Sequence, residues 1–139
     1  MALVEEVGTL PAINARELKA ETRRIEPGVI VLAVNGSMIL ERRCEQLESL
    51  VRDLLTRKEN KIVFDVSEVT RIDSTGVGII AICAGLTRNA GGELRVAGAH
   101  GRVQHVLNLA KVNCIVSLYP TITAALEGLI RQESAGSAA

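Results

Sequence analysis

Aromatic side chains are nearly absent from this 139-residue chain, which has one Phe, one Tyr and no Trp. Proteins that bind single-stranded nucleic acid stack bases on aromatic side chains, and only Phe64 and Tyr119 are available here. Neither sign of charge is in excess, because 16 basic residues balance 16 acidic ones. The sequence therefore has no electrostatic footprint for DNA, RNA or an anionic bilayer, and its core must be aliphatic.

A membrane-spanning run and a disulfide framework are also lacking. The longest uncharged apolar stretch, Val77 to Leu86, is far shorter than the ~20 residues that cross a bilayer. Three widely spaced cysteines, Cys44, Cys83 and Cys114, lie among apolar neighbours, and we expect buried free thiols. Acidic residues near the N-terminus oppose a signal peptide. These absences predict a protein of the reducing cytoplasm with no membrane span.

The length and composition suit one domain with a true core, since 47 % of the residues are hydrophobic. Residues 1–18 have no clean period, and we expect them to form an N-terminal arm or adapter. Residues 134–139 are small and polar, which predicts a disordered tail. The domain itself is expected over residues 19–133.

A β-hairpin is predicted at the start of this domain. The mostly polar segment 19–26 is followed by Pro27-Gly28, a pair that suits a type II turn. The β-branched run 29–34 has no polar face and predicts a strand covered on both sides. We expect the polar segment to form the edge of the sheet.

Helices and strands are predicted to alternate after the hairpin. Apolar spacing predicts helices at 40–55, 77–88, 103–110 and 122–130, the last capped by Thr121. Strands are expected at 62–66 and 93–97, with a short last one at 115–116 and a loop at 67–72. Helical crossovers join parallel strands. The pattern predicts an α/β sandwich with a mixed, partly parallel sheet of four to five strands and about four helices.

A glycine motif in the middle of the chain raises the hypothesis of a dinucleotide site. Gly76, Gly78 and Ala81 fit the pattern G-x-G-x-x-A and open a helix. In such sites a strand runs straight into the glycines and an acidic residue ends the next strand. Here a polar segment precedes the glycines, and Glu93 begins its strand. We therefore expect no bound cofactor.

The same region raises the hypothesis of a small serine hydrolase. Ser74 would be the nucleophile, with Glu93 and either His100 or His105 completing a triad. However, Ile72 replaces the first glycine of the nucleophile elbow. The two histidines are five positions apart, so they do not stack on one helix face as metal ligands do. We expect no metal site and two solvent-facing histidines.

The hydroxyl of Ser74 suggests a different role. We expect it at or next to the N-cap of its helix, where backbone N–H groups are unpaired and favour negative charge. A phosphoryl group there would add about −1.5 to −2 charge to an otherwise uncharged surface beside Gly76 and Gly78. A partner packed on that surface would then lose contact. The alternative is that Ser74 only caps the helix.

These elements resemble the STAS domain, the family of sulphate transporters and anti-sigma factor antagonists. The resemblance spans about Glu21 to Arg131. It rests on the strand at 62–66, the motif Asp73-Ser74-Thr75-Gly76-Val77-Gly78, the Gly91-Gly92 pair and the strand at 93–97. It implies a stand-alone bacterial anti-sigma factor antagonist that is not an enzyme. Such a protein binds a serine-kinase anti-sigma factor while unphosphorylated, is released on phosphorylation, and is reset by a phosphatase.

The resemblance assigns the phosphoacceptor to Ser74 and a partner-binding surface to the whole motif, residues 73–78. One departure concerns Gly36-Ser37-Met38-Ile39, where the family often has Gly-Glu-Leu-Asp. Met38 and Ile39 either bind a different partner or pack into the first helix. The rival hypothesis is a non-switching STAS subunit of a lipid-transport or scaffold complex. The identity of the sigma factor and the formation of a homodimer stay open.

Overall fold

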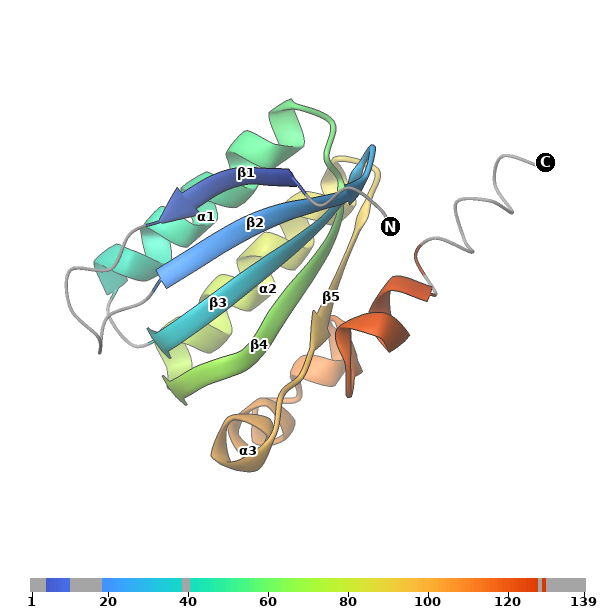
Figure 1. Cartoon of the computed structure of the whole chain (residues 1–139). Helices are drawn as coiled ribbons and strands as arrows, with labels where there is room; N and C mark the ends of the chain where they lie inside the picture. Colours follow the sequence, from blue (N-terminus) through green and yellow to red (C-terminus); the bar gives the residue numbers. More distant parts are fainter. Residues whose placement is uncertain (1–4, 11–18, 39–40, 128, 130–139) are drawn as a thin grey trace.

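A six-stranded mixed sheet forms the centre of the computed structural model, which describes residues 5–10, 19–38, 41–127 and 129 (Figure 1). Its strands lie side by side in chain order. They are β1 (Glu5–Leu10), β2 (Lys19–Glu26), β3 (Val29–Met38), β4 (Lys61–Ile72), β5 (Glu93–Ala97) and β6 (Ser117–Tyr119). The pairs β1–β2 and β2–β3 are antiparallel, and every later pair is parallel.

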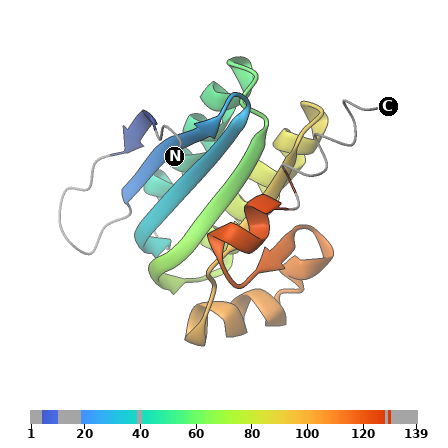
Figure 2. The ribbon, with the colours of Figure 1, turned by 45° about the vertical axis from the view of Figure 1, so that its right-hand side comes forward.

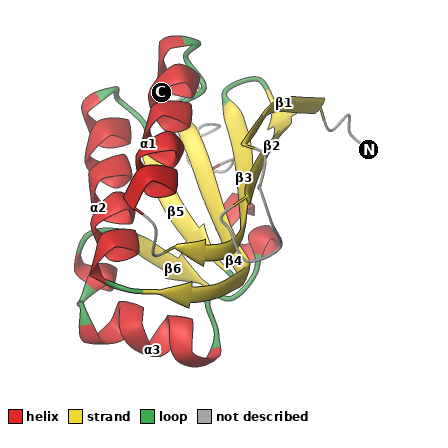
Figure 3. Cartoon of the chain, turned by 90° about the vertical axis from the view of Figure 1, so that its left-hand side faces the viewer, coloured by secondary structure: helices red, strands yellow, loops and turns green. Residues whose placement is uncertain are grey.

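Two helices, α1 (Glu41–Thr56) and α2 (Ser74–Asn89), lie next to each other on one face of the sheet (Figures 1 and 3). Helix α3 (Gly101–Leu109) lies beyond one end of the strands (Figure 3). A last helix, at residues 122–127, covers part of the opposite face (Figure 2). Parallel neighbours need such crossovers, because a tight turn joins only antiparallel strands. The predicted α/β sandwich is confirmed.

The core has two parts, one on each face of the sheet. Toward α1 and α2, alternate residues such as Ile30, Leu32 and Phe64 are fully buried. On the other face Val31 and Val63 pack against the last helix. Because both faces of β3 and β4 are covered, their central residues form continuous apolar runs instead of alternating with polar ones.

Arg95 of β5 attaches the last helix to the sheet. Its side chain is only 8 % exposed, and its Nη1 donates a hydrogen bond of 3.1 Å to the carbonyl oxygen of Ala125. Its Nε donates one of 2.8 Å to Glu93, and its guanidinium lies 5.0 Å from the ring centroid of Tyr119. These contacts satisfy a buried cation that would otherwise be costly.

The predicted hairpin is confirmed, with Gly28 at φ +85°, but two expectations about the sheet are wrong. The sheet has six strands instead of four to five, because residues 5–10 of the expected arm form β1. β1 pairs with the outer side of β2, so β2 is not an edge strand. Mixed polar and apolar residues in β1 hide its strand period.

Two other strand boundaries differ from the prediction. The expected loop at 67–72 is a continuation of β4, which pairs with the end of β3 from Asn35↔Glu68 to Met38↔Ile72. The polar side chains of residues 67–72 suggest a loop in the sequence. They are tolerated in a strand because that end of the sheet is less covered. The last strand starts at Ser117, after a 3-10 turn at Val112–Cys114, instead of at 115. The predicted cap is confirmed, since the amide of Ala124 donates to Thr121 Oγ1 at 3.1 Å.

The cysteines are not all buried as predicted. Cys44 and Cys83 are completely buried between α1, α2 and the sheet, whereas Cys114 is exposed. Apolar neighbours in the sequence suggested burial, but the 3-10 turn places Cys114 at the surface. Over the described ranges, none of the helices has the length and apolar character needed to cross a bilayer.

Candidate functional site

The N-terminus of α2 is capped by Asp73, the last residue before the helix. Its Oδ1 accepts hydrogen bonds from the backbone amides of Thr75 at 2.9 Å and Gly76 at 3.4 Å. Ser74 is therefore the first helical residue, next to the cap as expected. The alternative that Ser74 itself is the cap is wrong, because a carboxylate already accepts from the first-turn amides.

The Ser74 side chain is exposed to solvent. The Ser74 hydroxyl makes no hydrogen bond with any residue in the described part of the chain. No contact within the fold therefore requires a serine at this position. Thr75, the next residue, is half-buried. An enzyme that approaches this end of α2 from solvent therefore meets the Ser74 hydroxyl first.

Gly76 lies on the side of α2 that faces the protein. A Cβ atom at this position would be 2.4 Å from the Met38 carbonyl oxygen and 2.7 Å from Ile72 Cγ1. Met38 itself is fully buried in the core, which is the second of the two alternatives for this residue. Ile39 lies outside the described residues. Gly76 thus allows α2 to lie directly against the end of β3.

A different surface runs along the solvent side of α2. Spacings of four, seven, eight and eleven residues from Ser74 place Gly78, Ala81, Ile82 and Gly85 on the same side of the helix, and we call these five residues the open face. A Cβ atom at Gly78 or Gly85 would meet nothing within 4 Å. Ile82 is 46 % exposed, and no charged residue lies between Ser74 and Thr87.

The sequence motif identified only the beginning of this surface. Gly78 was assigned to the partner-binding residues, whereas Ile82 and Gly85 were not. Their helical spacing from Ser74 is the sequence signal that places these two residues on the same face as Ser74. Val77, also assigned to the partner, is half-buried and packs against the core, so it is not part of the open face.

Burial sets the pKa of the two thiols that lie behind the site, those of Cys44 and Cys83. Burial, and secondarily the nearby Asp73 carboxylate, raises the pKa of Cys44 to about 11. Burial, and secondarily the charge of Glu48, raises the pKa of Cys83 to about 12. Both groups are therefore protonated and unreactive near neutral pH, since the thiolate is the nucleophile.

The residues of the hydrolase hypothesis do not come together. Ser74 begins α2 and Glu93 follows its other end, so a helix of roughly 24 Å separates them. The Glu93 carboxylate is bound by Arg95. Both histidines are exposed as predicted, and His100 Nε2 lies 3.1 Å from the Ser67 carbonyl oxygen. Within the described residues no cluster of His, Cys, Asp and Glu has the form of a metal site.

Comparisons with known proteins agree with this arrangement. A Thermotoga maritima protein, provisionally named an anti-sigma factor antagonist, is 28 % identical over 109 residues, covering 78 % of this chain and 96 % of its own. An anti-sigma factor antagonist structure from Mycobacterium paratuberculosis has a TM-score of 0.71 at 24 % identity, covering 86 % of this chain and 98 % of that chain.

The antagonist SpoIIAA in its unphosphorylated form shares the fold at 14 % identity and a TM-score of 0.69. The match covers 81 % of this chain and 96 % of that chain. SpoIIAA of Bacillus is also solved in a phosphorylated form. The family model of the STAS domain matches residues 21–125, which include the whole of α2 and all strands from β3 to β6. The chain belongs to the STAS domain family.

Proposed function

We propose that this chain is an anti-sigma factor antagonist whose binding to a serine-kinase anti-sigma factor is switched by phosphorylation of Ser74. The observation that carries the proposal is the free, exposed hydroxyl at the first residue of α2, beside an uncharged surface. Asp73 already caps the helix, so the fold does not need a hydroxyl at this position. The names of the relatives support the same class of partner.

In this mechanism the unphosphorylated chain docks through the open face of α2. Glycines at 78 and 85 leave the helix backbone bare, which lets a partner approach closely, and Ile82 supplies an exposed apolar contact. Docking along the part of this face from Gly78 to Gly85 buries no charged residue of α2. The bound anti-sigma factor is then unable to hold its sigma factor, and transcription from that sigma factor increases.

Phosphorylation reverses the preference. The anti-sigma factor transfers the terminal phosphoryl group of ATP to Ser74 Oγ. A bond forms between Oγ and phosphorus, the bond from phosphorus to the ADP oxygen breaks, and the hydroxyl proton passes to a base of the kinase. The product carries about −1.5 to −2 additional charge. Burying this dianion against an apolar partner surface is strongly unfavourable, so the complex dissociates.

The Asp73 carboxylate strengthens this effect. It holds the first-turn amides of Thr75 and Gly76, which are the groups that would otherwise stabilise a phosphate at the helix N-terminus. A phosphate on Ser74 therefore lies beside a like charge and is directed outward, toward the partner. A phosphatase that removes the phosphate restores the neutral surface.

The test compares Ser74→Ala and Ser74→Asp with the unchanged chain, using purified candidate anti-sigma kinases and ATP. The exposed Ser49 of α1 provides the matched control, as Ser49→Ala. We expect phosphate on Ser74 in the unchanged chain and in the control, and none in Ser74→Ala. In pull-downs without ATP, Ser74→Ala is retained and Ser74→Asp is lost.

The rival hypothesis of a non-switching STAS subunit predicts a different pattern. A subunit of a lipid-transport or scaffold complex would retain its partner equally in all four proteins, with or without ATP. Equal retention, or phosphate on a residue other than Ser74, would therefore reject the switch.

A further inference from the structure

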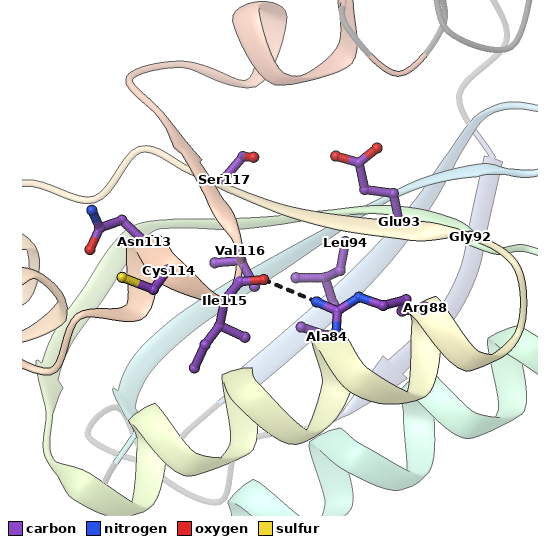
Figure 4. Close-up of a pocket in the computed structure, with 10 residues that line it drawn as sticks. All are labelled: Ala84, Arg88, Gly92, Glu93, Leu94, Asn113, Cys114, Ile115, Val116 and Ser117. Atoms are coloured by element: carbon purple, nitrogen blue, oxygen red, sulfur yellow. Dashed lines mark hydrogen bonds between the residues drawn. The ribbon is translucent and has the colours of Figure 1, made fainter.

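A cavity of about 300 Å³ lies at the other end of α2, far from Ser74 (Figure 4). Its lining includes Ala84 and Arg88 of α2, Leu94 of β5, and Asn113, Cys114 and Ile115 of the segment before β6. This volume is at the lower end of the range for small-molecule sites. No residue of the switch site takes part in it.

The cavity exists because β6 is shorter than β5. The ladder between them begins at Arg95↔Ser117, whereas β5 pairs with β4 from Lys61↔Glu93 onward. The first two residues of β5 thus have a neighbouring strand on one side only. The amide of Glu93 donates to Asn60 on that side at 3.0 Å. Backbone groups alternate along a strand, so the Leu94 amide faces the side of the cavity.

Arg88 is the basic residue of the cavity lining, which also includes the acidic Glu93. Its Nη2 donates a hydrogen bond of 3.2 Å to the Ile115 carbonyl oxygen. A guanidinium has five N–H donors, and Arg88 forms no ion pair with any residue that the structure describes. The carboxylate of Glu93 does not neutralise it. Glu93 points to the opposite side of the strands and is bound by Arg95 at 2.8 Å (Figure 4).

Four of the lining residues are apolar, and they lie beside the polar Asn113 and Ser117. Ala84, Leu94, Ile115 and Val116 are on the same side of the strands as Arg88 (Figure 4). Leu94 and Val116 are nearly fully buried, whereas Ile115 is 41 % exposed at the rim. The cavity therefore combines one unpaired guanidinium with a short apolar floor. A small anion with an aliphatic body matches both features.

We propose that this cavity binds a small organic carboxylate, with the carboxylate paired to Arg88 and the aliphatic part against Leu94 and Val116. Arginine and carboxylate match in geometry, because two parallel N–H groups meet two oxygens. The site is independent of the switch at Ser74.

Cys114 provides a built-in reporter, since it is the exposed thiol that lines the cavity. Cys44 and Cys83 are buried, with pKa values raised to about 11 and about 12, so they do not react with alkylating reagents under mild conditions. Iodoacetate and iodoacetamide alkylate the same thiol and differ chiefly in the carboxylate. Their rate ratio on Cys114 therefore measures carboxylate recognition, because any effect of Arg88 on the thiol itself cancels.

We expect the iodoacetate-to-iodoacetamide rate ratio on Cys114, followed by mass spectrometry, to exceed that of the uncharged thiol N-acetylcysteine amide by about five-fold. Arg88→Gln, which keeps hydrogen-bond donors but not the charge, should bring the ratio to that of the free thiol. Arg88→Lys should keep part of it. The matched control is Arg102→Gln, which removes an exposed arginine of α3 and should leave the ratio unchanged. Circular dichroism verifies the fold of each variant.

A second measurement tests the aliphatic part. Millimolar 3-methylbutanoate should slow iodoacetamide alkylation of Cys114, whereas 3-methylbutanamide and inorganic phosphate at equal ionic strength should not. The proposal is overturned by a ratio equal to that of N-acetylcysteine amide, by an equal fall in Arg88→Gln and Arg102→Gln, or by equal protection from phosphate.

Discussion

The two sides of α2 use glycine for opposite reasons. On the packed side, Gly76 has no room for even one more carbon atom, because the end of β3 fills the space. On the open face, Gly78 and Gly85 have empty space where a Cβ atom would be. Glycine in a helix costs about 1 kcal/mol relative to alanine. The packed glycine repays this cost through close packing of α2 on β3, whereas no contact in the described structure does so on the open face.

Among the substitutions, the largest expected effect on stability is that of Gly76→Ala. The new Cβ atom would lie 2.4 Å from the Met38 carbonyl oxygen, which is backbone and unable to rotate away. Overpacking of this kind costs about 3 kcal/mol of unfolding free energy, which exceeds the gain in helix propensity. Urea denaturation followed by circular dichroism measures the loss. An unchanged midpoint would mean that α2 is free to move away from β3.

Alkaline pH should also weaken the packed side. The folded pKa values of Cys44 and Cys83 are raised from 9.0 to about 11 and about 12, so above pH 9 the unfolded chain loses these protons first. Stability is therefore complete below pH 9 and falls as pH rises toward 11, by about ten-fold in the folding equilibrium constant per pH unit and thiol.

Denaturant titrations from pH 8 to pH 10.5 test this expectation. Cys83→Ala is the comparison variant, and it should be less stable at pH 8 but lose less on going to pH 10.5. The control is Cys114→Ala, which removes an exposed thiol instead of a buried one. An identical slope in all three proteins would place the alkaline transition elsewhere.

The cap at the start of α2 should have a smaller effect. Asp73→Ala removes the acceptor for the amides of Thr75 and Gly76 and should cost about 1 kcal/mol of unfolding free energy. Asp73→Asn keeps an oxygen acceptor and should lose less, so it separates the hydrogen bonds from the charge. Equal losses in both variants would assign the stabilisation to charge alone.

Local sequence signals predicted most of the fold, and their failures have a physical cause. The hairpin, α1, α2 and β5 were foreseen, because their apolar spacing or turn residues are strong within a short window. The sequence pattern did not predict β1 or the end of β4. Polar residues at the margin of a sheet form strands only because they pair with neighbouring strands. Tertiary contacts, which the sequence pattern does not contain, decide such elements.

The features of the site divide in the same way as the fold, into those set by local sequence signals and those set by tertiary contacts. The motif at residues 73–78 located the accessible Ser74, since capping and glycine signals are local. The burial of Met38 depends on how β3 ends beneath α2, and the exposure of Cys114 depends on a 3-10 turn. The cavity beside Arg88 depends on the different lengths of β5 and β6. These features arise from segments far apart in the chain.

The smallest effect on stability is the most informative about function. Gly78→Ala and Gly85→Ala each place a methyl group in open space, so each should stabilise the chain by about 0.5–1 kcal/mol. Urea denaturation checks this gain, which has the opposite sign to that of Gly76→Ala. In stability alone the two variants should be indistinguishable.

Binding to an anti-sigma factor should separate them. Gly78 lies one helical turn from Ser74, whereas Gly85 lies three turns away. If docking is centred on Ser74, Gly78→Ala holds the partner away from the helix and weakens binding by about ten-fold, while Gly85→Ala, at the far end of the open face, weakens binding less. Calorimetric titration with both variants decides the matter. Equal weakening by the two variants would mean that the interface extends along the whole open face. Unchanged binding in both variants would mean that the open face is not part of the interface, because a surface that tolerates added methyl groups is not in close contact.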